Sequence, residues 1–234
     1  MKNDFTNYSH CKEASPAFTL AEVLITLGII GVVAAMTMPS LIAAHRKHEV
    51  VTKLEKIYSV FNQAVRTSTV EHGDVTSWGI DCGNSNNVKC TTDEALERFN
   101  EYIGKYLQIT SITKKDDNTG FYIFLNDGSI LKIDNFLYDI NFYINKKAIN
   151  NPRQGINSFY FRFNPVLREG QTAENNKYAI KETFEPYAFG WDGTREGLLN
   201  TSNAMACGGI YSNYCGKLIQ YEGWKIPDDY PYKF

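Results

Sequence analysis

Twenty consecutive residues without a charge, from Val23 to Ile42, restrict the possible folds of this chain more than any other stretch. A helix of that length, at about 1.5 Å of rise per residue, spans roughly 30 Å, the hydrocarbon thickness of one bilayer. A cleaved secretory signal would have a shorter apolar region followed directly by its cleavage site, whereas here Leu41-Ile42-Ala43-Ala44 leads into more helix. A buried core helix is the other alternative, and the position beside the N-terminus favours a membrane-spanning segment over it.

The rest of the chain is polar enough to face water. The net charge of -2 and the pI near 6.1 give no electrostatic reason to expect a nucleic-acid partner. The chain has 234 residues with 15 Tyr and 14 Phe, so the part after the apolar run can bury a core. The composition therefore predicts a water-facing head on an apolar N-terminal stem.

Apolar residues keep recurring at three- and four-residue steps after the apolar run, which indicates one stripe of an amphipathic helix. No glycine lies between Gly31 and Gly73, and Pro39 can kink the helix without ending it. We therefore expect one long helix over residues 18–73, of which 18–42 is the membrane half. The predicted stripe comprises Val50, Val51, Leu54, Ile57, Tyr58, Phe61, Ala64, Val65 and Ser68.

Residues 74–234 are expected to form the head that covers this stripe. Thr91 and Glu94 fit a capping box and predict a short helix after them. Apolar and aromatic runs predict strands, and Asn126-Asp127-Gly128-Ser129 predicts a hairpin turn between the first two. The order of helices and strands predicts an α+β fold in which an antiparallel sheet packs on the long helix. The predicted strands are 121–125, 130–134, 136–144, 158–163 and 177–181.

Four of the five cysteines fall into two pairs beyond the apolar run. Seven residues separate Cys82 from Cys90, and seven separate Cys207 from Cys215, so neither pair has the C-x-x-C spacing of zinc or redox sites. Two disulfides in an oxidising compartment are the expected state, with the local pairing the least demanding. Crossed pairings and four free thiols stay open as alternatives. Cys11 lies before the apolar run.

The start of the apolar helix resembles the N-terminal segment of type IV pilins and type II secretion pseudopilins. In that family a polar leader is followed by Phe, then T-L-x-E, then an apolar helix with a proline near its end. Here F-T-L-A-E runs from Phe18 to Glu22, and Pro39 stands where the family has its proline. The motif is specific because Phe, Leu, Glu and the uncharged run must all lie at fixed offsets. The resemblance covers residues 17–42.

This resemblance implies that the chain matures as a prepilin. Residues 1–17 would be the leader, and a prepilin peptidase would cut between Ala17 and Phe18 and methylate the new amine of Phe18. Ala17 stands where the family usually has glycine. Glu22 would then pair with the N-terminal amine of a neighbouring subunit, because the two opposite charges enter an apolar filament core together more readily than either does alone. The alternative is that the Glu22 side chain extends to the cytoplasmic surface of the membrane and has no role in assembly.

The function implied by the resemblance is that of a subunit of a type IV pilus or of a type II secretion pseudopilus. Before assembly the chain would be a single-pass protein of the inner membrane with its head in the periplasm, and afterwards part of a filament in the periplasm or on the cell surface. Its partners would be the prepilin peptidase/methyltransferase, other copies or related pilin subunits, and the inner-membrane assembly platform. A minor or tip subunit whose head binds a surface, a secreted protein or DNA is the alternative.

No catalytic motif accompanies this pattern, so we do not expect an enzyme. The sequence lacks G-x-S-x-G, H-E-x-x-H and a phosphate-binding glycine loop, which leaves a membrane-anchored hydrolase with a carboxylate pair as the remaining alternative. We expect no cofactor and no metal, with calcium as the one ion that side-chain oxygens could hold. The segment from Gly155 to Phe159 resembles a weak form of the G-x-D-x-F segment of some prepilin heads. The candidate calcium ligands are Asp134, Asp139, Asn141 and Asn157.

Overall fold

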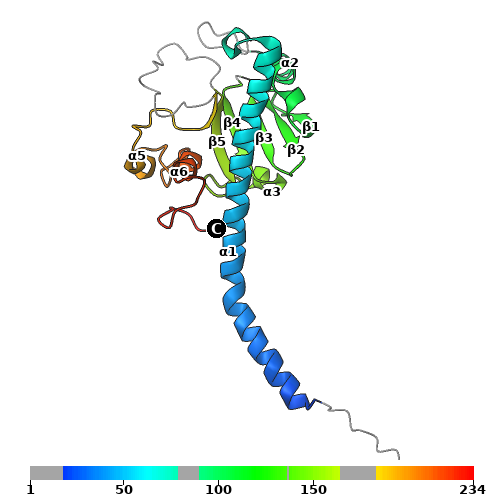
Figure 1. The fold of residues 1–234 in the computed structure, drawn as a ribbon, viewed down its shortest axis with the longest axis vertical. Coiled ribbons are helices and arrows are strands. Elements are labelled where there is room, and N and C mark those ends of the chain that lie inside the picture. Colours follow the sequence, from blue (N-terminus) through cyan, green and yellow to red (C-terminus); the bar gives the residue numbers. More distant parts are fainter. Residues whose placement is uncertain (1–17, 79–89, 136, 164–182) are drawn as a thin grey trace, which may run out of the picture. The chain divides into compact units, whose positions relative to one another are not determined.

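The computed structural model describes residues 18–78, 90–135, 137–163 and 183–234. It begins with α1 (Leu20–His72), a helix of 53 residues, and continues into a head built on a six-stranded antiparallel sheet (Figure 1). The α+β fold predicted from the sequence is therefore confirmed. The chain divides into two compact units, residues 1–42 and residues 43–234.

The first part of α1 is a candidate membrane span by length and composition. Its most apolar window of 18 residues has a mean hydropathy of 2.2, and none of that window is buried. Leu27 and Ile30 are 60% and 63% exposed, as are many of their apolar neighbours. A helix from the core of a soluble protein would bury these side chains, so their exposure argues against the core-helix alternative.

The second part of α1 presents the predicted apolar stripe to the head. Val50, Leu54, Ile57 and Phe61 are between 0% and 3% exposed, and the rest of the stripe is buried or half-buried. The side chains on the opposite face of this part of the helix are solvent-exposed, for example at residues 55, 59 and 63. The 3.6-residue periodicity in the sequence therefore identified the buried face of α1 correctly.

The sheet is a meander in which each strand pairs antiparallel with the next. Its spatial order is β1-β2-β3-β4-β5-β6, the same as the order along the chain (Figure 1). Short turns suffice for such connections, which is why turn signals separate most strands in the sequence. The strands are β1 (Ile109–Lys114), β2 (Gly120–Leu125), β3 (Ile130–Asp134), β4 (Asp139–Tyr143), β5 (Ser158–Phe163) and β6 (Phe184–Pro186).

Most of the predicted strands are present, with two differences. The hairpin between β2 and β3 is confirmed, with Gly128 at φ 78° and the Asp127 carboxylate accepting a bond from the Ser129 N–H. The run predicted as a strand over 136–144 becomes one only from Asp139, because Leu137 has a φ of 59° that no strand accommodates. Strands β1 and β6 were not predicted, and the run 177–181 lies outside the described residues.

Aromatic side chains fill the space between α1 and the sheet. The ring of Phe61 on α1 stacks on Phe184 of β6 with centroids 4.0 Å apart, and Phe184 stacks in turn on Phe161 of β5 at 4.7 Å. Phe163 meets the edge of Phe61 at 5.6 Å. All four rings are 2% exposed or less, so this cluster joins the helix to the β5–β6 side of the sheet.

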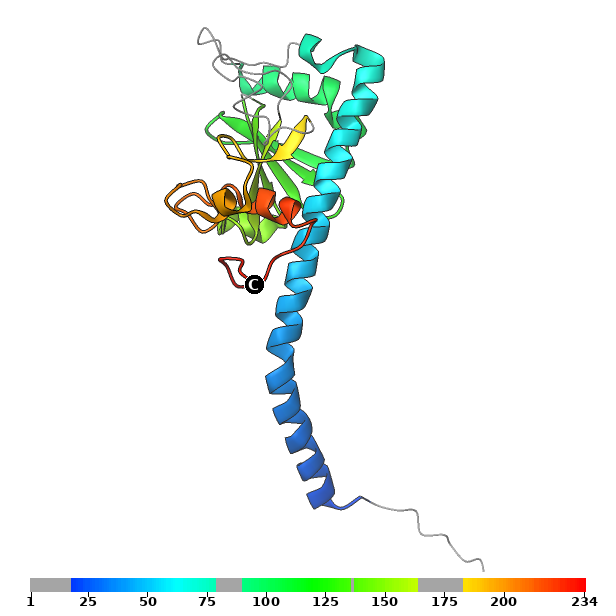
Figure 2. The same ribbon diagram turned by 60° about the vertical axis from the view of Figure 1, so that its left-hand side comes forward.

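The short helices lie around the sheet. The predicted helix after Thr91 is α2 (Thr92–Tyr102), and both bonds of the predicted capping box between Thr91 and Glu94 are present. In two views α2 lies at the end of the head that the C-terminus of α1 reaches, and α3 (Lys146–Asn150) lies at the other end (Figures 1 and 2). The remaining helices are η1 (Val75–Ser77), η2 (Gly104–Tyr106), α5 (Arg195–Leu199) and α6 (Cys215–Tyr221).

A buried ion pair fixes α6 to β6. The Lys217 ammonium lies 2.9 Å from a carboxylate oxygen of Glu185, and the two side chains are 3% and 1% exposed. The Tyr58 hydroxyl of α1 donates to the other carboxylate oxygen at 3.5 Å. The carboxylate of Glu185 therefore joins α6, β6 and α1, and loss of either charge would break an ion pair in a buried position, which is costly.

Asn62 gives α1 a specific contact with the last strand. Its amide nitrogen donates to the Phe184 carbonyl at 2.8 Å, and its amide oxygen accepts from the Phe184 N–H at 3.0 Å. The side chain therefore pairs with the backbone of β6 as a neighbouring strand would. Because Asn62 is 2% exposed, water cannot replace these bonds.

We predict that Asn62→Leu destabilises the head by about 2–4 kcal/mol, because both backbone groups of Phe184 lose their buried partner. Gln63→Leu, at the exposed neighbouring position, should change stability by no more than about 0.5 kcal/mol. Denaturant unfolding of the full chain in detergent, followed by near-UV circular dichroism, measures both. Equal stability of the two variants would contradict the role given to Asn62.

Candidate functional site

Glu22 caps the helix in which it stands. One oxygen of its carboxylate accepts the Thr19 N–H at 2.8 Å and the Thr19 hydroxyl at 2.7 Å, while the Glu22 N–H donates to the Thr19 hydroxyl oxygen at 3.2 Å. These reciprocal bonds form a capping box, with Thr19 as the N-cap of α1. The carboxylate therefore satisfies the Thr19 N–H, and the Thr19 hydroxyl satisfies the Glu22 N–H, one of the donors that the first helical turn leaves free.

Sequence reasoning missed this capping role. It treated Glu22 only as a charge in search of an external partner, although T-L-A-E has the same S/T-x-x-E spacing that predicted the cap of α2. The carboxylate still has acceptor capacity, because its two oxygens offer about four lone-pair sites. The geometry thus allows Glu22 to cap its own helix and to accept a further donor.

The residues around Glu22 leave it accessible. Phe18 is 86% exposed and Leu20 is 78% exposed, and Glu22 itself is exposed. Ala17, the other residue of the predicted cleavage site, lies outside the described residues. Pro39 lies within α1, which continues past it to His72, so the proline does not end the helix. A kink there stays a prediction.

One predicted disulfide is present in the structure. Cys207 and Cys215 are bonded, with their Cα atoms 4.5 Å apart, and both are fully buried. Cys90 is also disulfide-bonded, but Cys82 lies outside the described residues, so the pairing between those two stays a prediction. Within the described part of the head, the bridge closes the loop that leads into α6.

The segment compared with a prepilin-head motif packs against this bridge. Gly155 has a φ of 81°, and a Cβ at this position would come within 2.8 Å of the Cys215 sulfur and of the Tyr232 ring. The Gly155 carbonyl accepts a bond from the Tyr230 hydroxyl at 2.6 Å. Glycine at this position therefore lets the turn before β5, the disulfide and the C-terminal segment pack together.

Three of the four candidate calcium ligands have other partners, and the fourth, Asp139, has one buried carboxylate oxygen without a hydrogen-bond partner. Asn157 accepts the Arg153 N–H at 2.6 Å, and Asn141 accepts the Ser158 hydroxyl at 2.9 Å. Asp134 lies 3.5 Å from the Lys132 ammonium. Among the described residues no three His, Cys, Asp or Glu side chains are grouped so as to hold a metal ion. Asn157 stands where the G-x-D-x-F segment has its Asp, and in this structure its side chain stabilises the turn before β5.

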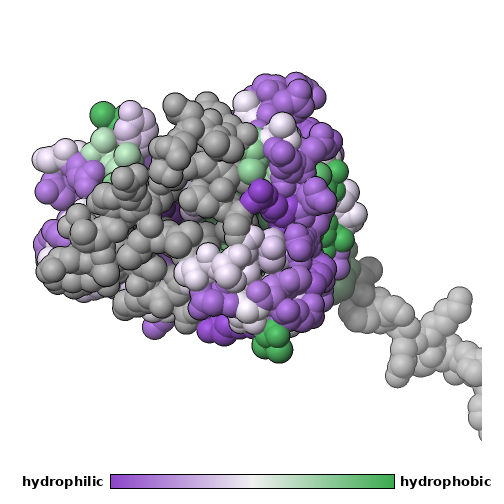
Figure 3. Space-filling view, turned by 90° about the horizontal axis from the view of Figure 1, so that it is seen from above, coloured by the Kyte–Doolittle hydropathy of each residue, from purple (hydrophilic) through white to green (hydrophobic). Residues whose placement is uncertain are grey.

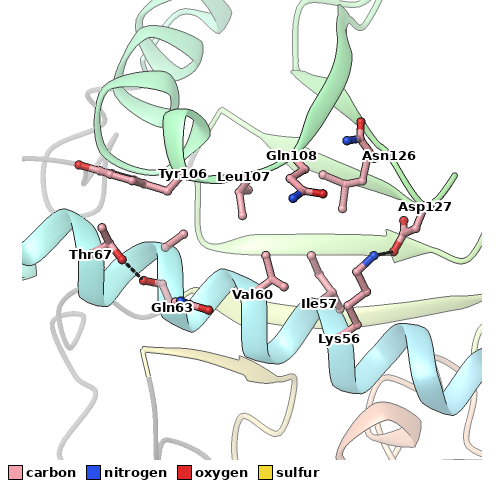
Figure 4. Close-up of a pocket in the computed structure, with 12 residues that line it drawn as sticks. Lys56, Ile57, Val60, Gln63, Thr67, Tyr106, Leu107, Gln108, Asn126 and Asp127 are labelled. Atoms are coloured by element: carbon pink, nitrogen blue, oxygen red, sulfur yellow. Dashed lines mark hydrogen bonds and ion pairs between the residues drawn. The ribbon is translucent and has the colours of Figure 1, made fainter.

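A hollow of 420 Å³ opens between α1, the segment before β1 and the β2–β3 turn (Figure 4). Ile57 and Val60 line it from α1, and Leu107 lines it from the opposite side. Its charged lining residues, Lys56 and Asp127, pair at 2.8 Å and join α1 to the β2–β3 turn. Burial of Asp127 would raise its pKa, but the bonds from Lys56 and Ser129 outweigh burial, so that the pKa is lowered. The Asp127 carboxylate therefore stays ionised near neutral pH and is held by Lys56.

Comparison with known proteins identifies the family of the head. The model of a family of unknown function, DUF6613, matches residues 40–234. The chain belongs to this family. Searches of the curated proteins and of the solved structures gave no match. The DUF6613 match spans the head and the part of α1 that packs on it, and it does not include residues 18–39, where the pilin-like motif lies.

For this DUF6613 protein we predict two local disulfides in material from the oxidising compartment. Non-reducing peptide mapping should recover Cys207 linked to Cys215, and Cys82 linked to Cys90. The double variant Cys207→Ala/Cys215→Ala should lose about 2–3 kcal/mol of unfolding free energy, because the bridge closes a short loop. Cys11→Ala should leave stability unchanged. A Cys82–Cys215 peptide, or free thiols, would refute the pairing.

Proposed function

We propose that this chain is a prepilin-like subunit of a type IV pilus or of a type II secretion pseudopilus. Its apolar helix would hold it in the inner membrane, with the head on the periplasmic side. A prepilin peptidase would remove residues 1–17, and the assembly platform would then draw the mature chain into a filament. Other copies or related subunits would surround the apolar helix there in place of lipid.

The observation that carries the proposal is the single carboxylate at the start of the otherwise uncharged and exposed first part of α1, up to Ile42. An acid within a membrane span is costly, and such residues mark functional positions. Glu22 has no cationic partner among the described residues, and its bonds to Thr19 are those of a cap. A neighbour's N-terminal ammonium, freed by cleavage before Phe18, is the partner that the motif implies.

The surface of the first part of α1 also supports a subunit that packs among copies of itself. Apolar side chains lie on all sides of this part, so it offers no preferred face to a neighbour. Dispersion contacts between such surfaces do not fix an axial position, because one apolar ring of side chains resembles the next. A charge pair at one end of the helix would set the axial register between neighbouring copies.

The mature chain is predicted to begin at Phe18 and to carry one methyl group on its amine. Intact-mass analysis of protein from the host measures both changes at once. A chain that still begins at Met1, or one cut after Ala44, would overturn the prepilin proposal. Ala17→Gly should be processed at least as well, and Ala17→Glu should block processing.

Two substitutions at Glu22 separate its capping role from its charge. Glu22→Ala removes both, whereas Glu22→Gln keeps an acceptor that a capping box accommodates. We predict that both variants insert into the membrane at normal levels, because a charged residue costs a few kcal/mol there. Both should yield less than about a tenth of the wild-type filaments, since a neighbour's ammonium left unpaired in an apolar core costs several kcal/mol.

The quantity of sheared filaments, measured by immunoblot at equal membrane levels of the subunit, decides between the two roles. Normal filaments from Glu22→Gln together with loss in Glu22→Ala would mean that capping alone matters. Normal filaments from both variants would exclude any assembly role for Glu22.

A further inference from the structure

The two ends of the head carry opposite charge. At the end near α3, four cationic side chains surround a hollow of 370 Å³, and Glu49 is the one carboxylate side chain in its lining. All four cations are solvent-exposed, and none forms an ion pair with another described residue. Glu49 is 3.0 Å from Lys53 and is therefore already paired. We call the four cations the basic cluster: Arg46, Lys147, Arg153 and Lys233.

The other end carries a ridge of carboxylates on α2. Glu94, Glu97 and Glu101 are all solvent-exposed, follow one another at helical steps of three and four residues, and are called the acidic ridge here. Glu97 and Glu101 form no ion pair with another described residue, while Glu94 also serves the capping box. Seen from above, the described surface at this end of the head is mostly hydrophilic (Figure 3).

The acidic ridge borders a hollow suited to a cation. The hollow has a volume of 460 Å³, and Trp78, Tyr102 and Arg98 line it together with the three carboxylates, so that negative charge is in excess there. The two aromatic rings are stacked with centroids 5.0 Å apart and planes within 8°. Carboxylates beside an aromatic surface are the surroundings that a guanidinium or ammonium group prefers.

The two charged surfaces lie far apart on one head, so they cannot neutralise each other within a chain. Arg46 and Glu71 mark these ends on α1 and are 25 residues apart, which is about 38 Å along a helix. In both views α2 and α3 lie at opposite ends of the head (Figures 1 and 2). The net charge of the chain is only -2, so the complementarity is local and does not come from bulk charge.

We propose that the basic cluster of one copy docks onto the acidic ridge of the next copy, head to tail. This inference rests on the proposed function as a filament subunit and names the contact between heads. Such an interface joins two different surfaces, so copies add to one another in an open filament whenever the rotation between them does not close a ring. Two heads meeting through the same end would instead place like charges together.

An anionic membrane is the competing occupant of the basic cluster, because Arg46 follows Ile42 by only four residues in α1. Lipid headgroups would leave the acidic ridge at the far end of the head unexplained. A second copy accounts for both surfaces at once and supplies carboxylates against the four cations. The observations therefore favour the copy over the membrane.

Charge reversal in the full chain, expressed in its host, tests the contact. One variant reverses the ridge (Glu97→Arg/Glu101→Arg), and the other reverses the cluster (Lys147→Glu/Arg153→Glu). Each alone should lose most of the sheared filament at unchanged membrane level and unchanged mature mass. Glu196→Lys, an exposed reversal on α5, is the control and should assemble normally.

Co-expression of the two defective variants provides the decisive measurement. The reversed ridge of one variant then meets the reversed cluster of the other, and the unreversed surfaces also match, so filaments should return. Restored filaments would support the contact. A combined variant that carries all four substitutions in one chain should also assemble. The contact would be overturned if neither co-expression nor the combined variant restored filaments. Loss only in the cluster variant, with no rescue, would assign the cluster to the membrane and equally overturn the contact.

A second readout separates this inference from the proposed function. Zero-length carbodiimide cross-linking of wild-type membranes and filaments should join Lys147 or Lys233 of one copy to Glu97 or Glu101 of another, as identified by mass spectrometry. If the wild-type chain is neither cleaved nor assembled, the proposed function fails, while these cross-links still test the contact. Their absence from assembled filaments would overturn the contact and leave the proposed function standing.

Discussion

The head depends on the stacking of Phe61 against Phe184, with the Asn62 side chain bonded to the backbone beside it. The first contact buries aromatic surface and is tolerant of small displacements, whereas the second fixes direction and register. The three-residue strand β6 has few ladder bonds of its own, so α1 acts as its second neighbour. Glu185 in the middle of β6 then brings α6 onto the same strand through Lys217.

One continuous helix thus carries two kinds of surface. Before Ala43 its apolar side chains are exposed on every side, and after it only one stripe is apolar and the sheet covers that stripe. A backbone whose hydrogen bonds are all internal can pass between such environments without rearrangement. The pilin-like motif and the DUF6613 match begin at different places in this helix, so the proposed processing signal lies outside the part of the sequence that defines the family.

Local sequence signals predicted most of the fold but not the surfaces. The stripe of α1, the cap of α2 and the β2–β3 turn follow rules that act over a few residues. β1 was missed because its edge position leaves I-T-S-I-T-K mostly exposed, without the apolar alternation of a half-buried strand. β6 was missed because it is short and ends in proline. The basic cluster draws on three distant segments, so only the folded chain reveals it.

The meander also determines when the parts of this head can form. The strands β1 to β4 follow one another after short connections, whereas the bonds between Asn62 and Phe184 join residues 122 positions apart. Folding slows as the sequence separation of contacts grows, because the entropy of closing a longer loop must be lost first. The hairpins are therefore expected to form before α1 docks. In that interval the aromatic face of the sheet is open to solvent, and the chain is then most prone to aggregate.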